Sequence, residues 1–153
     1  MPTPLIRTAR PDDLAAIVSF QLAMALETED RKLDRALVER GVARALADPG
    51  RGTYRVAELD GHVGVVGSLL ITREWSDWRD GWFWWIQSVY VTPAARGLGV
   101  YGALHSSVER DARADPEVCG VRLYVEVENV RARRTYERLG MSETSYRLYE
   151  VEL

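Results

Sequence analysis

The sequence lacks the features that mark secreted and membrane-spanning proteins. Its single cysteine, Cys119, leaves no partner for a disulfide within the chain. The N-terminal residues contain no apolar run of signal-peptide length, and nowhere do about 18 apolar residues follow one another, as a membrane-spanning helix requires. These absences favour a cytoplasmic protein without a membrane partner.

The sequence also lacks an excess of positive charge. The chain has 20 Lys and Arg residues against 23 Asp and Glu residues, a net charge of −3, whereas a nucleic-acid-binding surface needs clustered positive charge. The run Arg131, Arg133 and Arg134 is short and typical of a solvated helix face. The two histidines, His62 and His105, form nothing that resembles a cluster of metal ligands. We therefore expect neither a nucleic-acid partner nor a metal.

The length of 153 residues, with 46% hydrophobic residues and no repeat or long linker, predicts one domain over residues 1–153. Periodicity and turn signals predict elements in the order β-α-α-β-β-β-α-β-α-β. Asp60-Gly61 and Asp80-Gly81 are typical of primed hairpin turns. The expected strands are 5–8, 53–59, 63–72, 82–91, 121–127 and 146–151. The expected helices are one from 11 onward, 34–47, one from the glycines at 97–99 to 112, and 130–139.

The stretch GLGVYG, residues 97–102, fits the G-x-G-x-x-G pattern of dinucleotide-binding proteins. That fold places the pattern after the first strand of a repeated βαβ series. Here the glycines follow an antiparallel run of strands, and one βαβ crossover, residues 82–127, remains. A nicotinamide or flavin site is therefore disfavoured.

The loop nevertheless has the properties of an anion site. The first N–H groups of a helix have no intrahelical partner and lie at the positive end of its dipole. Glycines let a ligand approach this backbone closely, so the start of the helix suits an anion such as a diphosphate. The alternative is a glycine-rich turn that holds nothing.

Two segments resemble motifs of the GNAT superfamily of N-acetyltransferases. Residues 89–100, VYVTPAARGLGV, are similar to its acetyl-CoA motif, in which a strand and V-x-P precede R-G-x-G-[IV]. Residues 129–141, NVRARRTYERLGM, resemble its second motif, N-x-x-A-x-x-x-Y-x-x-L-G-F. The order of elements extends the resemblance over nearly the whole chain. It implies an α/β (α+β) fold with a mixed, mostly antiparallel sheet and helices on both faces.

The resemblance also implies acetyl-CoA as co-substrate. Backbone amides of the strand before the loop would pair with pantetheine, those of the loop would hold the diphosphate, and an asparagine side chain would contact the cofactor. The family's Q/R-x-x-G-x-G/A signature has Tyr101 at its last small position, so that ring either points away from the diphosphate or narrows the cradle. The implied residues are Val89, Tyr90, Val91, Arg96, Gly97, Leu98, Gly99, Val100, Tyr101, Gly102 and Asn129.

Two residues are candidates for proton transfer. Tyr136 matches the family's tyrosine that protonates the coenzyme A sulfur, and a phenol stays protonated at neutral pH; the alternative is a core tyrosine. Glu126 is the candidate general base, on one strand face with Tyr124 and Glu128; the alternative is a solvated strand-end charge. Cys119 has no helix start or neighbouring histidine to lower its pKa, which argues against an acyl-cysteine.

All five tryptophans lie within residues 75–85, more aromatic surface than one core layer requires. They line an acceptor pocket or form a contact between two copies, and a homodimer is one expectation. Together these patterns predict an N-acetyltransferase that moves the acetyl group of acetyl-CoA to a primary amine, of a small molecule or a peptide, by direct attack in a ternary complex. The alternatives are transfer of another acyl group, acetylation of a protein N-terminus or lysine, and a catalytically idle acyl-CoA sensor.

Overall fold

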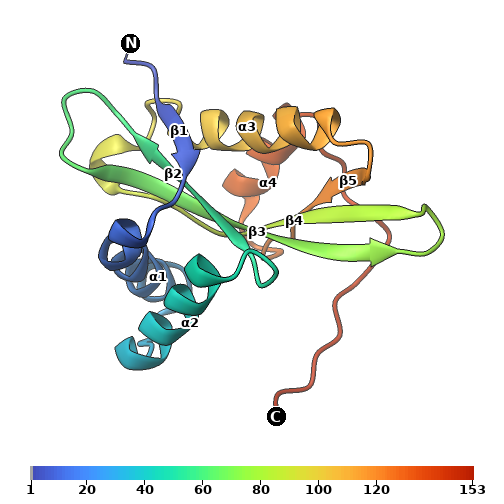
Figure 1. Cartoon of the computed structure of the whole chain (residues 1–153), viewed down its shortest axis with the longest axis horizontal. Coiled ribbons are helices and arrows are strands. Elements are labelled where there is room, and N and C mark those ends of the chain that lie inside the picture. Colours follow the sequence, from blue (N-terminus) through green and yellow to red (C-terminus); the bar gives the residue numbers. More distant parts are fainter. Residues whose placement is uncertain (1) are drawn as a thin grey trace. The chain divides into compact units, whose positions relative to one another are not determined.

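Five strands form one sheet in the computed structural model of the chain, which describes residues 2–153 (Figure 1). Their spatial order is β1-β2-β3-β4-β5, and neighbours are antiparallel except β4 and β5, which run parallel. The mixed, mostly antiparallel sheet expected from the sequence is confirmed. The strands are β1 Leu5–Thr8, β2 Thr53–Glu58, β3 Val65–Ser76, β4 Gly81–Val91 and β5 Val118–Arg122.

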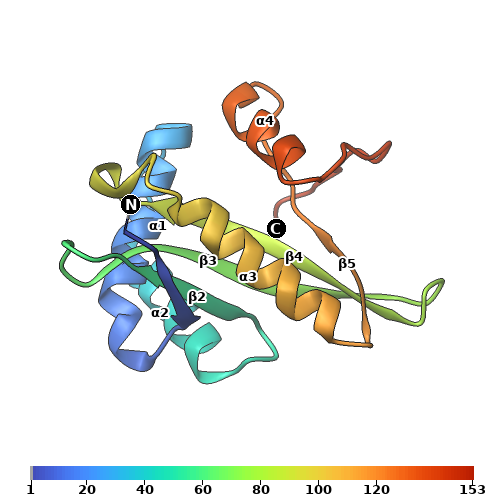
Figure 2. The ribbon, with the colours of Figure 1, turned by 90° about the horizontal axis from the view of Figure 1, so that it is seen from above.

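Helices cover both faces of this sheet, as the sequence predicted. On one face, Ile17 and Val18 of α1 and Val42 of α2 belong to one buried cluster. On the other face α3 runs lengthwise over the strands (Figure 2), and its Leu104 and Val108 are completely buried in a second cluster. The three helices are α1 Leu14–Glu29, α2 Arg35–Ala47 and α3 Val100–Ala114.

Strand β3 shows how the sequence divides between the two clusters. Leu69 and Ile71 belong to the cluster with α3, and Leu70 between them packs against the cluster with α1 and α2. Successive residues of a strand point to opposite faces, so a continuous apolar run supplies both layers. β3 thus contributes side chains to both clusters.

The chain forms two compact units, Met1–Leu123 and Tyr124–Leu153. The first holds the sheet with α1, α2 and α3, and the second holds α4, Val130–Arg138. The single domain expected over residues 1–153 stays a prediction. No helix within residues 2–153 is long and apolar enough to cross a membrane, and the cytoplasmic location also stays a prediction.

The strand expected at 121–127 lies earlier in the structure, where it forms β5. Its ladder with β4 ends at the pair Trp85–Arg122, and within residues 2–153 no strand pairs with the residues beyond it. A strand face exists only where a ladder holds the backbone extended. The shared face expected for Tyr124, Glu126 and Glu128 is therefore wrong, because residues 124–129 form a loop.

The final strand expected at 146–151 is also wrong for the described residues. This segment forms no ladder, and its apolar side chains face solvent: Tyr146 and Leu148 are each 74% exposed and Val151 is 81% exposed. Alternating apolar residues form a strand only where a neighbouring strand can pair with their backbone. Here that pairing is missing, so the pattern alone does not produce the strand.

Neither hairpin connection has the length predicted: the sequence left residues 60–62 and 73–81 between the expected strands. The β2–β3 connection covers residues 59–64, with Gly61 and Gly64 at φ values of 82° and 70°. The β3–β4 connection covers residues 77–80, and Asp80 has a φ of 47°. The two Asp-Gly pairs do mark turns, but they do not form primed two-residue turns.

An ion-pair network joins β1 to the start of α1. Arg7 donates to both carboxylate oxygens of Asp13, at 2.8 and 3.1 Å, and to Glu58 of β2 at 2.8 Å. Asp13 also accepts the backbone N–H of Arg10 at 2.7 Å. The hydrogen bond from Arg7 is the main reason why the pKa of Asp13 lies below its ordinary value.

We expect Asp13→Asn to lower the free energy of unfolding by about 1.5–3 kcal/mol at pH 7, the contribution of a hydrogen bond to a charged group. Because the folded-state pKa is lowered, this stability is present above the unfolded pKa of about 4 and disappears as the pH falls through the folded value. Urea unfolding should show the two proteins converging in acid. The exposed neighbour Asp12 supplies the control, Asp12→Asn, and equal stability of all three proteins at pH 7 would contradict the assignment.

Candidate active site

The outer edge of β4 is open over its second half. β5 pairs with β4 from Trp82 to Trp85, and no other strand of residues 2–153 lies beside β4 on that side. The N–H of Thr92 donates to Val66 of β3 at 2.8 Å. Backbone groups alternate sides along a strand, so the N–H of Val91 points to the open edge. This edge can therefore receive an extended ligand that forms backbone hydrogen bonds.

A bulge interrupts β4 beside the open edge. Ser88 and Val89 lie opposite the single residue Leu69 of β3. Ser88 has a φ of 51°, a left-handed conformation that is uncommon outside glycine. A bulge leaves the extra residue out of the ladder and re-aims the backbone around it. The backbone N–H groups near Ser88 are thus candidates for binding an oxygen atom in the open strand edge.

The glycine loop that follows β4 forms a cradle lined by backbone. Gly97 and Gly99 have φ values of 78° and 80°, and a Cβ added at either would meet no atom within 4 Å. The first intrahelical hydrogen bond of α3 runs from the N–H of Ala103 to the carbonyl of Gly99, at 3.0 Å. The N–H groups of residues 100–102 therefore lack helical partners and lie at the positive end of the dipole. This geometry suits a diphosphate.

The side chain of Tyr101 lies against the next turn of α3. Its hydroxyl lies 3.3 Å from Nδ1 of His105, one turn further along, and the two ring centroids are 5.9 Å apart. His105 is 3% exposed, and burial lowers the pKa of its imidazole. The tyrosine at the family's small position thus leaves its backbone N–H at the cradle and its ring beside a buried histidine.

The side chains of Arg96 and Tyr90 lie on the α1 side of the sheet. Arg96 donates to Glu27 of α1 at 2.7 Å and to the carbonyl of Val91 at 2.9 Å. Its guanidinium lies 5.5 Å from the centroid of Tyr90, which packs against Phe20 at 5.3 Å between ring centroids. The structure therefore gathers residues 89–102 at one place, but it directs these two side chains toward α1.

The second unit contains the other three predicted site residues. Asn129 begins α4, and its Oδ1 accepts the N–H of Ala132 at 3.1 Å. Tyr136 is half-buried and lies about 10 Å further along the helix axis, as seven residues at 1.5 Å each require. Glu126 is exposed in the loop before the helix, and its carbonyl accepts the N–H of Asn129 at 3.0 Å. Their approach to the glycine loop stays a prediction.

Two features of this region were not predicted from the sequence. Ser88 could be read as a residue that positions a water, but its bulge had no signal, because the left-handed conformation favours glycine and the chain has serine there. Glu27 lies 69 residues before Arg96, its ion-pair partner, and a helical periodicity cannot show such a contact. Among residues 2–153 no group of three or more potential metal ligands occurs.

The comparison with known families gives a match to the acetyltransferase (GNAT) family over residues 15–141. No curated protein matches the chain. Among solved structures, a possible acetyltransferase from Clostridium difficile 630 is 42% identical in sequence, with a TM-score of 0.91. The alignment covers 98% of this chain and 97% of that one.

Two further structures share the fold at low sequence identity. A ribosomal-protein-alanine N-acetyltransferase from Brucella melitensis biovar Abortus 2308 is 16% identical, with a TM-score of 0.77 and 99% of each chain covered. An aminoglycoside N-acetyltransferase in complex with CoA is also 16% identical, with a TM-score of 0.75 over 99% of this chain and 96% of that one. At this identity the similarity shows the fold alone.

Proposed function

Because the chain belongs to the GNAT family of acetyltransferases, we propose that it moves the acetyl group of acetyl-CoA to a primary amine by direct attack in a ternary complex. The observation that carries the proposal is the continuity of the open β4 edge with the glycine loop. One offers backbone groups to an extended pantetheine arm, and the other offers N–H groups of residues 100–102 to a diphosphate. Each charge-assisted hydrogen bond contributes about 1.5–3 kcal/mol, so a few of them account for micromolar affinity.

The reaction forms a bond between the amine nitrogen and the acetyl carbon and breaks the bond between that carbon and sulfur. Between these two steps the acetyl oxygen gains negative charge, and the bulge at Ser88 and Val89 would supply backbone N–H groups to it. Glu126, directly or through water, would accept the proton that the amine nitrogen loses. Tyr136 would donate a proton to the departing sulfur, and a phenol with a pKa of about 10 can do so at neutral pH.

The acceptor is proposed to be the primary amine of a small molecule or a peptide. The two structures of low identity act, by their names, on the alanine of a ribosomal protein and on aminoglycosides. Their common fold accommodates acceptors of either kind, which supports an amine but does not choose between sizes. The side chains of β4 and the helices α1 and α2 would shape the acceptor site in this chain.

A screen of amines for release of free thiol from acetyl-CoA tests the proposal. The library should hold small polyamines, aminoglycosides and peptides with free N-termini, with mass spectrometry to identify the acetylated product. We expect thiol release that depends on at least one amine and matches the product in amount. Coenzyme A binding without thiol release from any amine would instead favour the sensor.

We also propose that the end of the β3–β4 hairpin joins two copies of the chain. Trp78 is 86% exposed, whereas Trp75 is 48% exposed and packs against Trp82 at 4.9 Å between ring centroids. Trp78 therefore has the larger apolar surface left for a partner, and aromatic side chains dominate many interfaces.

Trp78→Ala should convert a dimer to monomers in analytical ultracentrifugation without loss of coenzyme A binding. Trp75→Ala is the matched control and should weaken the dimer less, because Trp75 already packs within its own hairpin. A wild-type protein that stays monomeric at high concentration would reject this interface. The tryptophans would then be assigned to the acceptor side, where their emission should shift when an amine binds.

A further inference from the structure

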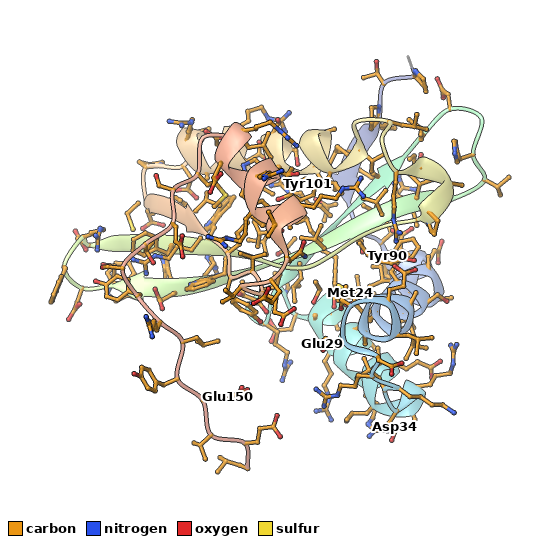
Figure 3. All side chains as sticks on the ribbon, turned by 180° about the vertical axis from the view of Figure 1, so that it is seen from behind. Met24, Glu29, Asp34, Tyr90, Tyr101 and Glu150 are labelled. Atoms are coloured by element: carbon orange, nitrogen blue, oxygen red, sulfur yellow. The ribbon has the colours of Figure 1, made fainter. Side chains whose placement is uncertain are left out.

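The last turn of α1 contacts the junction between β4 and the glycine loop through one carboxylate. Glu27 accepts a hydrogen bond from Arg96 at 2.7 Å on one oxygen and from the Tyr90 hydroxyl at 3.1 Å on the other. Figure 3 shows Tyr90 directed from β4 toward α1. One side chain of α1 thus contacts the proposed pantetheine-binding strand and the first residue of the diphosphate signature.

Arg96 is held from three sides. Besides Glu27, its Nε donates to the carbonyl of Val91 at 2.9 Å, and its guanidinium lies 5.5 Å from the centroid of Tyr90. Tyr90 packs against Phe20 of α1, whereas Val100 at the start of α3 belongs to the cluster on the opposite face. The guanidinium therefore lies on the side of the sheet away from the helix start that would bind the diphosphate.

We infer that Glu27 is a positioning residue for coenzyme A and that Arg96 shapes the cradle without acting as a phosphate ligand. The inference rests on the proposed function. Glu27 fixes Arg96, Arg96 fixes the carbonyl of Val91, and the chain from Val91 to Gly97 thereby enters α3 with its N–H groups facing the ligand. The diphosphate then depends on backbone donors, while the charge of Arg96 is matched by the carboxylate of Glu27.

The energetics agree with a positional role more than with a stabilising one. The side chains of Arg96 and Glu27 are 43% and 40% exposed, and ion pairs at such exposure contribute little to stability. The hydrogen bond from Arg96 lowers the pKa of Glu27, so the carboxylate is ionised at neutral pH. A small misplacement of binding groups, by contrast, strongly affects a ligand that must meet several donors at once.

The test is a double-mutant cycle on coenzyme A affinity, measured by calorimetry, with Glu27→Ala, Arg96→Ala and both together. We expect each single variant to weaken binding about threefold to tenfold, and the double variant to be no weaker than either. Glu29→Gln, an exposed acid on the last turn of the same helix, should bind as wild type does. Thermal melts should differ little among all of them.

Steady-state kinetics distinguish a role of Glu27 in positioning coenzyme A from a role in stability alone. With an accepted amine, Glu27→Ala should raise KM for acetyl-CoA with kcat unchanged, because chemistry takes place at the other end of the cofactor. With S-acetylpantetheine, which lacks the diphosphate, Glu27→Ala should lower kcat/KM relative to wild type by a smaller factor than with acetyl-CoA.

If Arg96 binds phosphate, the effect of Glu27→Ala on the affinity for coenzyme A should have the opposite sign. If Arg96 were a phosphate ligand, Glu27→Ala would free its guanidinium and tighten coenzyme A, and the effects of the two variants would differ in direction. Tighter or unchanged binding by Glu27→Ala would overturn this inference alone. A wild-type chain that binds no coenzyme A would overturn the proposed function, and this inference with it.

Discussion

Replacing Gly99 with glutamate should abolish the binding of coenzyme A in calorimetry and leave the circular dichroism spectrum unchanged. A Cβ at this position meets no atom of the chain within 4 Å, so the protein itself has room for the side chain. The carboxylate would occupy the cradle and face the diphosphate. At about 4 Å, each pair of like charges costs between about 1 and 4 kcal/mol, depending on solvent exposure. Two phosphate charges therefore lower the affinity by about thirtyfold at the least.

The control for this prediction is Gly99→Lys. Gly99 has a φ of 80°, so either side chain strains the backbone by about 1–2 kcal/mol, and the strain alone cannot distinguish them. The lysine should retain measurable binding because its charge attracts the diphosphate. Equal loss in both variants would assign the effect to backbone strain, and unchanged affinity in Gly99→Glu would remove the diphosphate from this loop.

The sequence predicted the elements that depend on local chemistry. Residues 97–102 have glycines where the backbone takes a positive φ and opens toward a ligand, and the structure has Gly97 and Gly99 in that conformation. The resemblance to the GNAT motifs predicted helices on both faces of the sheet, which the two buried clusters confirm. Both predictions rest on motifs of a few consecutive residues.

Features that depend on a distant partner could not be predicted. The strand expected at 146–151 has the right alternation, but a strand also needs a partner in a ladder, and residues 146–151 form none with any described residue. The bulge at Ser88 depends on the register between β3 and β4. Glu27 is one of two acids in α1, and only the fold shows which of them contacts Arg96.

The same distinction between local and distant features applies to the residues of the candidate site. The backbone cradle follows from glycines and a helix start, whereas a proton donor must stand beside a particular sulfur atom. Asn129 and Tyr136 match the family's second motif, and the structure has Asn129 as the N-cap of α4 and Tyr136 within that helix. Mutation tests whether these two side chains act on the cofactor.

Removing the hydroxyl of Tyr136 should lower kcat by about 10²–10⁴-fold, the usual contribution of general acid catalysis. The proton is needed only as the sulfur leaves, so Tyr136→Phe should change the affinity for coenzyme A little. Steady-state kinetics on an accepted amine, paired with calorimetry of coenzyme A, separates the two effects. Phenylalanine keeps the ring of this half-buried side chain, so the melting temperature should remain close to that of wild type.

Tyr146→Phe supplies the matched control, because Tyr146 belongs to the same unit and is 74% exposed. It should have the kcat of wild type. If kcat falls equally in both variants, the loss reflects the unit as a whole and not the Tyr136 hydroxyl. If Tyr136→Phe has wild-type kcat, water or another side chain protonates the sulfur. If kcat falls only in Tyr136→Phe, and by the same factor for amines of different basicity, Tyr136 donates its proton to the leaving sulfur. If Tyr136 instead took part in removing the proton of the amine, the loss in kcat would depend on the basicity of the amine.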